Sequence, residues 1–268
     1  MKHTKLAKLR QRRSAELKLP TDIKAAVGRA TGRRHESAGL DCQDAVLRKI
    51  GQNFTAIALA DGAGTAKHSA EGAATVTKTV IEFLNSHFQY LLTASYEDTT
   101  QKIIEALQLS LGSKTVQLNC LTTDLASTLL FFATDGKSFV TGQVGDGRIA
   151  VRDAKTKIWS SIFEGQKGEF FNETTFVTSR GIHENIQLIR GDMGCVSACI
   201  LMSDGAEESL YQRKTRIFAS AMETIASWLV QSSTKSVEKS LNENLKTVLR
   251  TKTTDDVSLA LLVNISTF

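Results

Sequence analysis

Three aspartates stand at the ends of apolar runs that have the composition of buried β-strands. Asp61 ends the run AIALAD, Asp204 ends ACILMSD, and Asp255 opens the run DDVSLALL. A strand anchors the backbone of such an aspartate while its side chain points into a cleft. Several carboxylates in one cleft repel each other unless a cation neutralises them. The pattern therefore indicates a metal site.

Two glycines and a fourth acid extend this pattern. Gly62 and Gly205 directly follow Asp61 and Asp204, and they let the backbone turn and bring a carbonyl close to a ligand. Asp44 lies in CQDAV, just before another strand. An all-oxygen set favours Mg²⁺ or Mn²⁺ over zinc. Two such ions ~3.5–4 Å apart can hold a hydroxide nucleophile and clamp a phosphate oxygen.

Each acid also has a plain structural interpretation, because an Asp-Gly pair is more often a turn than a ligand site. Asp135 and Gly136 lie between two predicted strands and predict a simple hairpin turn. Asp146 and Gly147 predict a second hairpin in the same way. What favours chemistry for the other acids is their combination and order in one chain.

The order of the motifs resembles that of the metal-dependent type 2C serine/threonine protein phosphatases, the PPM family. The resemblance extends over about residues 25–265, and the matching segments are CQDA, ADGAG, ASTLL, VGDGRI, LMSDGAEE and TDDVSLALL. Each motif is weak alone, whereas six in the right order are a strong indication. The segments GRRHESAGLDCQDA and GEFFNETTF further resemble a bacterial-type subgroup of the family.

The resemblance implies a role for each acid. Asp61 would bridge two metal ions, and the Gly62 carbonyl would bind the second. Asp204 and Asp255 would hold the first ion, and together with Asp61 they would form the catalytic set. Asp44 would act near the second ion through water. The implied cofactors are two Mn²⁺ or Mg²⁺ ions.

Two further acids have secondary places in the family pattern. Asp146 would match an acid that some members use at a weaker third metal site, and it fits a simple hairpin turn equally well. Asp256 stands where the family has Asn or Asp beside the metal ligand, and we expect its role to be secondary.

The chain also departs from the family pattern. Ala63 stands where some members have a histidine proposed as general acid, and residues 39–40 fill the region of a phosphate-binding arginine. Leaving-group protonation would then fall to metal-bound water or to another group. Three residues just upstream are candidate phosphate ligands, although each also reads as a surface residue at a strand end: Arg33, Arg34 and His35.

These features predict a metal-dependent protein serine/threonine phosphatase that hydrolyses phosphomonoesters through a metal-bridged hydroxide, without a phosphoenzyme. Its substrate would be a phosphoserine or phosphothreonine protein, and its expected partner is a cognate serine/threonine kinase. The polar segment 160–182 would be a flap that determines substrate choice. One alternative is a pseudo-phosphatase that binds a phosphoprotein or kinase without turnover. Another is a metal phosphoesterase acting on a small molecule or nucleotide.

The composition is that of an ordinary soluble globular protein, with 268 residues, 41% hydrophobic and 23% charged. No window approaches the ~20 apolar residues of a membrane span, so no membrane role is expected. Residues 1–20 hold seven Lys/Arg and one Glu, a charge of +6, while the whole chain is +5. We expect a solvated basic tail over 1–20, with nucleic-acid binding as the less favoured alternative. A single phosphatase-like catalytic domain would span 21–268.

The cysteines do not have the CxxC spacing of a metal site. Cys195 and Cys199 flank a run of small residues and are predicted to be buried thiols. Because residues 1–20 lack the apolar core of a secretion signal, a cytoplasmic protein with reduced thiols is expected.

The elements that must position these acids follow from hydrophobic periodicity. Strands are predicted at 23–31, 54–60, 127–134, 138–144, 148–153, 186–190, 196–203 and 257–265, and helices at 71–92, 97–111, 214–230 and 236–250. Strands such as residues 128–133 are apolar on both faces, which suits a sheet between helices and a second sheet. The predicted fold is α+β, a four-layer helix–sheet–sheet–helix sandwich with two mainly antiparallel sheets.

Overall fold

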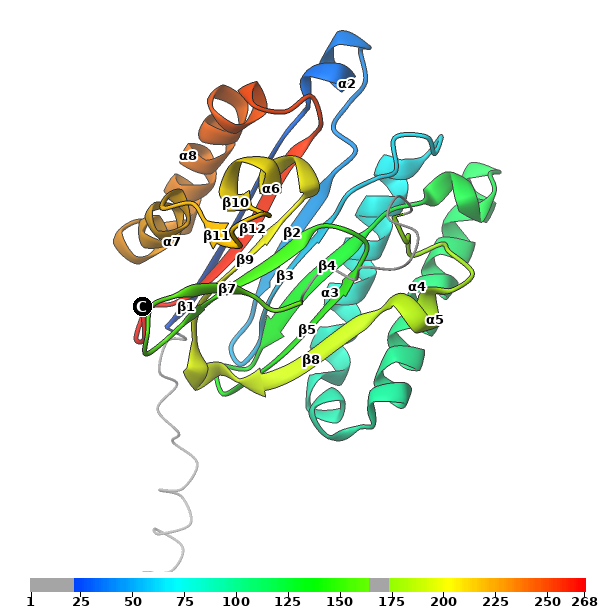
Figure 1. Ribbon diagram of the computed structural model, residues 1–268. Helices are drawn as coiled ribbons and strands as arrows, with labels where there is room; N and C mark the ends of the chain where they lie inside the picture. Colours follow the sequence, from blue (N-terminus) through cyan, green and yellow to red (C-terminus); the bar gives the residue numbers. More distant parts are fainter. Residues whose placement is uncertain (1–21, 164–173) are drawn as a thin grey trace, which may run out of the picture.

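The computed structural model describes residues 22–163 and 174–268 of the chain. Two five-stranded antiparallel sheets lie face to face, and helices cover the outer face of each sheet (Figure 1). This arrangement is the predicted helix–sheet–sheet–helix sandwich, and the predicted fold class is confirmed. The expected basic tail over 1–20 lies outside the described residues. Within the described residues, no helix is long and apolar enough to cross a membrane.

The first sheet has the strand order β1-β12-β9-β6-β7. Its strands are β1 (Ile23–Ala30), β12 (Val257–Asn264), β9 (Val196–Met202), β6 (Arg148–Asp153) and β7 (Trp159–Ser161). Two helices pack on its outer face, α7 (Ala221–Gln231) and α8 (Thr234–Thr247). In α8 the buried side chains are Val237, Leu241 and Leu245, so one helical face contacts the sheet.

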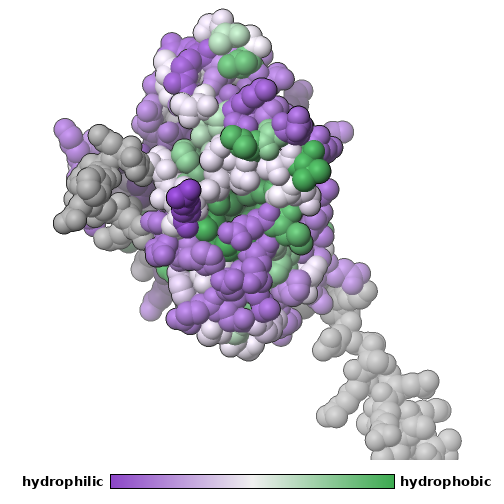
Figure 2. Space-filling view, turned by 90° about the vertical axis from the view of Figure 1, so that its right-hand side faces the viewer, coloured by the Kyte–Doolittle hydropathy of each residue, from purple (hydrophilic) through white to green (hydrophobic). Residues whose placement is uncertain are grey.

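The second sheet has the strand order β2-β3-β4-β5-β8. Its strands are β2 (Ala45–Ile50), β3 (Thr55–Ala60), β4 (Leu129–Thr134), β5 (Ser138–Val144) and β8 (Gln187–Asp192). The long helix α3 (Ser69–Thr93) packs on this sheet and α4 (Tyr96–Leu118) packs on α3, with the short α5 (Ile182–Asn185) beside α4. Helix α4 leaves Leu109 and Val116 exposed, and the face on its side is mostly polar with scattered apolar groups (Figure 2).

The core explains why the central strands are apolar on both faces. In β3, Ile57 and Leu59 belong to the cluster between the two sheets. Ala56 and Ala58 belong to the cluster under α3, because successive side chains of a strand point to opposite faces. The small alanines on the helix side leave room for α3 to approach the sheet closely.

The predicted hairpin at Asp146 and Gly147 is wrong. Strand β5 lies in the second sheet and β6 in the first, so residues 145–147 carry the chain from one sheet to the other. The buried Gln143 amide donates hydrogen bonds to the carbonyls of Gly145 (2.9 Å) and Gly147 (2.7 Å), and thereby braces this crossover. A glycine-rich turn signal does not distinguish a hairpin from a corner between sheets. The hairpin predicted at Asp135 and Gly136 does form.

Other local predictions also need correction. The helix expected over 214–230 begins only at Ala221, and a two-stranded hairpin precedes it, β10 (Tyr211–Gln212) and β11 (Ile217–Phe218). The structure describes the predicted flap, residues 160–182, only at its two ends, where β7 runs into it and α5 begins at its last residue. Cys195 is exposed in the 3₁₀ turn before β9, whereas Cys199 is buried in that strand as expected.

Two helical glycines test how tightly α3 is packed. A Cβ added at Gly72 would lie 2.1 Å from the Leu125 carbonyl oxygen, whereas a Cβ at Gly112 in α4 would meet nothing within 4 Å. We expect Gly72→Ala to lower the free energy of unfolding by roughly 1–3 kcal/mol, the usual cost of overpacking. Gly112→Ala should raise it by about 0.5–1 kcal/mol through helix propensity. Urea denaturation measures both changes, and stabilisation by Gly72→Ala would contradict this packing.

Candidate active site

Strand pairing brings four of the predicted acids to one end of the sandwich. Asp61 follows β3 and Asp44 precedes β2, and these two strands pair antiparallel with Ala45 opposite Ala60. In the other sheet Asp204 follows β9 and Asp255 precedes β12, again an antiparallel pair. An antiparallel pair sets the end of one strand beside the start of the next. Packing of the two sheets then brings both pairs together.

Asp61 is the most firmly positioned of these acids. Its backbone N–H donates to Thr128 Oγ1 (2.9 Å), and its carbonyl accepts from the Thr128 N–H (2.8 Å). A bridge between Gly62 and Ser127 uses the Asp61 carbonyl and the Ala63 N–H, so the Gly62 carbonyl lies outside it. A Cβ on Gly62 would lie 2.8 Å from the Gln43 carbonyl oxygen. Glycine is therefore required here for close packing.

The carboxylates affect one another strongly. Burial raises the pKa of Asp61 well above its ordinary value, and the charges of Asp44 and Asp204 raise it further. Burial likewise raises the pKa of Asp44 to about 7. The Ser258 hydroxyl acts in the opposite direction and lowers this pKa, whereas the charges of Asp256 and Asp204 raise it further. The pKa of Asp204 is raised by burial first and then by its acidic neighbours.

The carboxylate oxygens of this cluster have the chemistry that suits a hard cation. Neither Asp44 carboxylate oxygen has a hydrogen-bond partner of regular geometry among the described residues, although both are buried. Buried acceptors of this kind need a donor or a cation. Asp61 and Asp204 affect each other's pKa in opposite directions, raising that of Asp61 and lowering that of Asp204, so the two side chains lie close together. Among the described residues, no group of three or more His, Cys, Asp or Glu side chains is already arranged to hold a metal ion.

Asp256 is a buried clamp beside these acids. Its carboxylate accepts hydrogen bonds from the backbone N–H groups of Gly32 and Gln43, both at 2.6 Å. His35 Nδ1 lies 3.0 Å from the same carboxylate. Asp256 therefore holds residues 31–43 against the start of β12, and this segment leads directly into Asp44. The interpretation of His35 as a surface residue is wrong, because it is buried in this contact.

The three candidate phosphate ligands lie in different places, on and around the short helix α2 (Arg33–Ser37). Arg33 Nε donates to the Thr253 carbonyl (3.0 Å). His35 faces Asp256. Arg34 Nη2 lies 3.5 Å from Asp255 Oδ1, and its side chain is 60% exposed. A Cβ on Gly64 would lie 3.1 Å from the same nitrogen. Of the three candidates, only Arg34 faces solvent beside the acids.

Asp146 lies at the margin of the site. It is exposed on the braced crossover of residues 145–147, and its carboxylate accepts a hydrogen bond from Thr174 Oγ1 (2.8 Å). Its charge contributes to raising the pKa of Asp204, so the two carboxylates lie near each other. The position is compatible with a peripheral ligand of the site.

A buried ion-pair network beside Asp204 was missed from the sequence. Glu207 in α6 (Asp204–Leu210) is 1% exposed, and its Oε1 accepts from Arg148 Nη2 and Arg213 Nε, each at 2.9 Å. The Arg148 guanidinium lies 3.9 Å from the Tyr211 ring centroid. The available signal was Arg148 at the start of an apolar strand, but a pairing across 59 residues is not visible in the sequence.

Comparison with known proteins identifies related chains. The family model described as "Protein phosphatase 2C" matches residues 31–250. No curated protein matches the sequence.

Three solved structures illustrate the likeness of the fold. A bacterial serine phosphatase is 17% identical with a TM-score of 0.59, covering 90% of this chain and 97% of that one. The serine/threonine phosphatase Stp1 from Staphylococcus aureus is 17% identical with a TM-score of 0.58, covering 93% and 98%. RsbX in complex with magnesium is 14% identical with a TM-score of 0.53, covering 90% and 94%.

The raised carboxylate pKa values generate a prediction for stability. In chelator the folded protein binds more protons than the unfolded chain between pH 4, the ordinary aspartate pKa, and about 7 for Asp44. The free energy of unfolding should therefore fall as pH rises through this range. Asp61→Asn should flatten the slope, because it removes one of the coupled ionisations. Denaturant titrations at several pH values measure the slope of the free energy of unfolding against pH for wild type and variant.

Saturating Mn²⁺ or Mg²⁺ provides the converse measurement. A cation favours the ionised carboxylates, so it should stabilise the protein most at the higher pH, by about 2.7 kcal/mol at one hundred times Kd. Identical pH slopes for wild type and Asp61→Asn in chelator would show that the acids are not coupled.

Proposed function

Because the chain belongs to the protein phosphatase 2C family, we propose that it hydrolyses phosphoserine and phosphothreonine side chains of proteins with the help of two divalent cations. The observation that carries this proposal is the meeting of four strand-end carboxylates from two sheets, with unpaired buried oxygens on Asp44. A kinase that phosphorylates the same proteins would be the opposing partner of such an enzyme.

The positions of the acids suggest which ion each of them would bind. Asp61 would be shared by both ions, since its backbone is fixed at two points and its side chain is coupled to Asp44 and Asp204. Asp204 and Asp255 would complete one side, and Asp44 with the Gly62 carbonyl the other. When bound, Mn²⁺ or Mg²⁺ would activate water for attack on phosphorus and neutralise charge on the phosphoryl oxygens. The fold neighbour RsbX was solved with magnesium.

Arg34 would orient the phosphoryl group at the solvent side of this cluster. It lies beside Asp255, faces solvent, and carries the terminal amines that bind a phosphate oxygen well. Ala63 offers no proton donor, so the leaving-group proton would come from solvent. Asp146 would act as a peripheral acid and ligate a weaker third ion.

A binding-only pseudo-phosphatase is the second candidate function. Arg34 is paired with Asp255, and Ala63 stands in place of an acid; these are the features that favour it. Both candidates require the same fold, so only turnover separates them.

Hydrolysis of p-nitrophenyl phosphate tests the proposal directly. Wild type should turn over with Mn²⁺ or Mg²⁺ and not with chelator, and Asp61→Asn should lose at least about 100-fold, since the metal site supplies several kcal/mol. Asp135→Asn is the matched control, because Asp135 caps a hairpin turn and accepts from Gln89 on α3, and it has no contact with the acid cluster. Turnover of phosphopeptides over nucleotides would identify the substrate class. A folded wild type inactive with either metal would support the pseudo-phosphatase.

The proposed role of Arg34 can be measured separately. Arg34→Ala should lower kcat/KM by about 10–100-fold, the value of one charge-assisted hydrogen bond, and Arg34→Lys should restore part of it. Arg33→Ala is the control, because that side chain is engaged with the Thr253 carbonyl. Equal losses for both arginine variants would indicate a structural effect on α2 rather than phosphate binding.

A further inference from the structure

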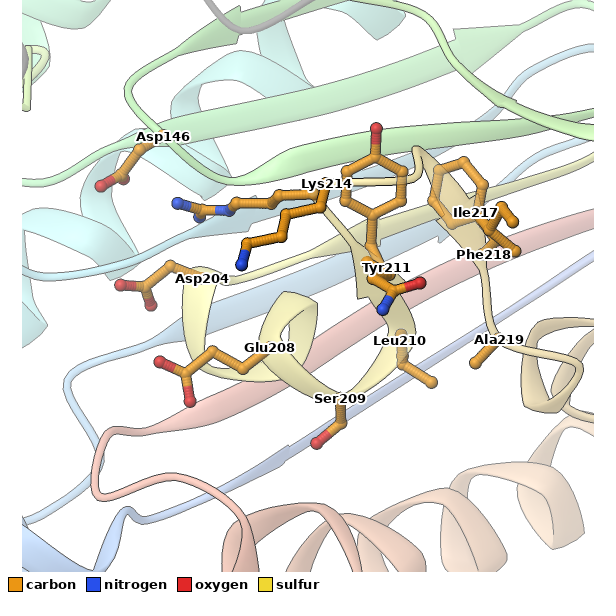
Figure 3. A pocket seen from close by; sticks show the side chains of 12 residues that line it. Asp146, Asp204, Glu208, Ser209, Leu210, Tyr211, Lys214, Ile217, Phe218 and Ala219 are labelled. Carbon is orange, nitrogen blue, oxygen red and sulfur yellow. The ribbon is translucent and has the colours of Figure 1, made fainter.

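A groove of about 730 Å³ begins at Asp146 and Asp204 and continues along the β10–β11 hairpin. Figure 3 shows Asp146, Asp204 and Glu208 at one end of the groove, and Ile217 and Phe218 at the other. Arg213 and Lys214, in the loop of the hairpin, also line it. The groove therefore passes from an acidic end, past two cations, to an apolar end.

Arg213 is anchored in a way that leaves its binding atoms available. Its Nε donates to the buried Glu207 carboxylate (2.9 Å), while the side chain remains 68% exposed. That bond leaves the two terminal amino groups of the guanidinium for other acceptors. The hydrogen bond and the charge of Glu207 raise the pKa of Arg213, and Asp146 and Asp204 contribute to a lesser degree. Arg213 thus lies close to the acids of the proposed active site.

The base of the hairpin holds this arginine in a defined position. Glu207 also accepts from Arg148, whose guanidinium packs over the Tyr211 ring at 3.9 Å. The Tyr211 and Phe218 rings lie 4.6 Å apart across the two strands and pack the hairpin together. A side chain held at Nε by a buried carboxylate loses less freedom on binding than a free one.

We propose that Arg213 and Lys214 bind an acidic side chain next to the phosphorylated residue of the protein substrate. The proposal rests on the proposed phosphatase function, because it places the phosphoryl group at the acid end of the groove. The two terminal N–H₂ groups of the Arg213 guanidinium can donate charge-assisted hydrogen bonds to a carboxylate. The volume of the groove exceeds that of a phosphoryl group, so neighbouring residues of a peptide fit in it. An apolar side chain of the peptide would then reach Ile217 and Phe218.

The negative charge of Glu208 opposes the attraction that Arg213 and Lys214 provide. It is exposed at the acidic end of the groove and would repel the same peptide carboxylate. The two cations are therefore needed to make the groove attractive to an acidic peptide. Glu208→Gln should increase the preference for such peptides.

The test compares two phosphothreonine peptides that differ only in carrying glutamates or lysines on both sides of the phosphothreonine. Wild type should favour the glutamate peptide by about tenfold in kcat/KM, as expected for charged contacts. The double variant Arg213→Glu, Lys214→Glu should abolish or reverse this ratio. The control is Lys114→Glu, which changes a partly exposed lysine on α4, in the helix layer far from the groove. A ratio on one enzyme is insensitive to the amount of folded protein.

Two outcomes would overturn the proposal. The first is the same peptide ratio in wild type and the double variant. The second is an equal loss on both peptides and on p-nitrophenyl phosphate, which would put Arg213 on the phosphoryl group. If wild type has no turnover, the proposed function fails, but the groove is still tested. Fluorescence anisotropy of the two labelled peptides in the Asp61→Asn background then reports the preference without hydrolysis, and equal affinities would overturn it.

Discussion

Mutual repulsion among buried carboxylates is the constraint on which the rest of this structure depends. Burial raises the pKa values of Asp44, Asp61 and Asp204, and the charges of neighbouring acids raise each of them further, so the fold must hold these carboxyl groups where their ionised forms are disfavoured. It does so with strands rather than flexible loops, because each acid lies within two residues of a hydrogen-bonded strand. Apolar packing between the two sheets supplies the favourable free energy that offsets this repulsion.

The contacts of Asp256 fix the chain segment that leads into Asp44. Two backbone donors and His35 converge on its buried carboxylate, so its charge is compensated by the protein itself. The neighbouring Asp255 has a solvent-facing arginine instead. Two adjacent aspartates therefore have opposite tasks. One is neutralised within the fold and shapes the site, and the other remains available to it.

The strand-end acids and the layered fold could be read from the sequence, because both follow from short-range patterns. An apolar run with Asp at its end predicts Asp61 and Asp204, and antiparallel pairing does the rest. Contacts between distant segments could not be read. His35 is buried by Asp256, and Glu207 is paired with Arg148, through packing that leaves no periodic signal. The crossover at Asp146 was predicted as a hairpin because glycine permits both geometries.

The hydrogen bond between Gly32 and Asp256 spans 224 residues, and β1 pairs with β12 along its whole length. During synthesis, the segment that positions Asp44 therefore waits for β12, which is made last among the described strands. A nascent chain lacks Asp255 and the Asp256 clamp until that strand emerges, so its acids have no complete cluster. Because contacts between such distant segments carry a large loop-closure cost, the acid cluster forms only once β12 has paired with β1. A chain that stops before β12 would therefore hold Asp44, Asp61 and Asp204 without the residues that complete and position their cluster.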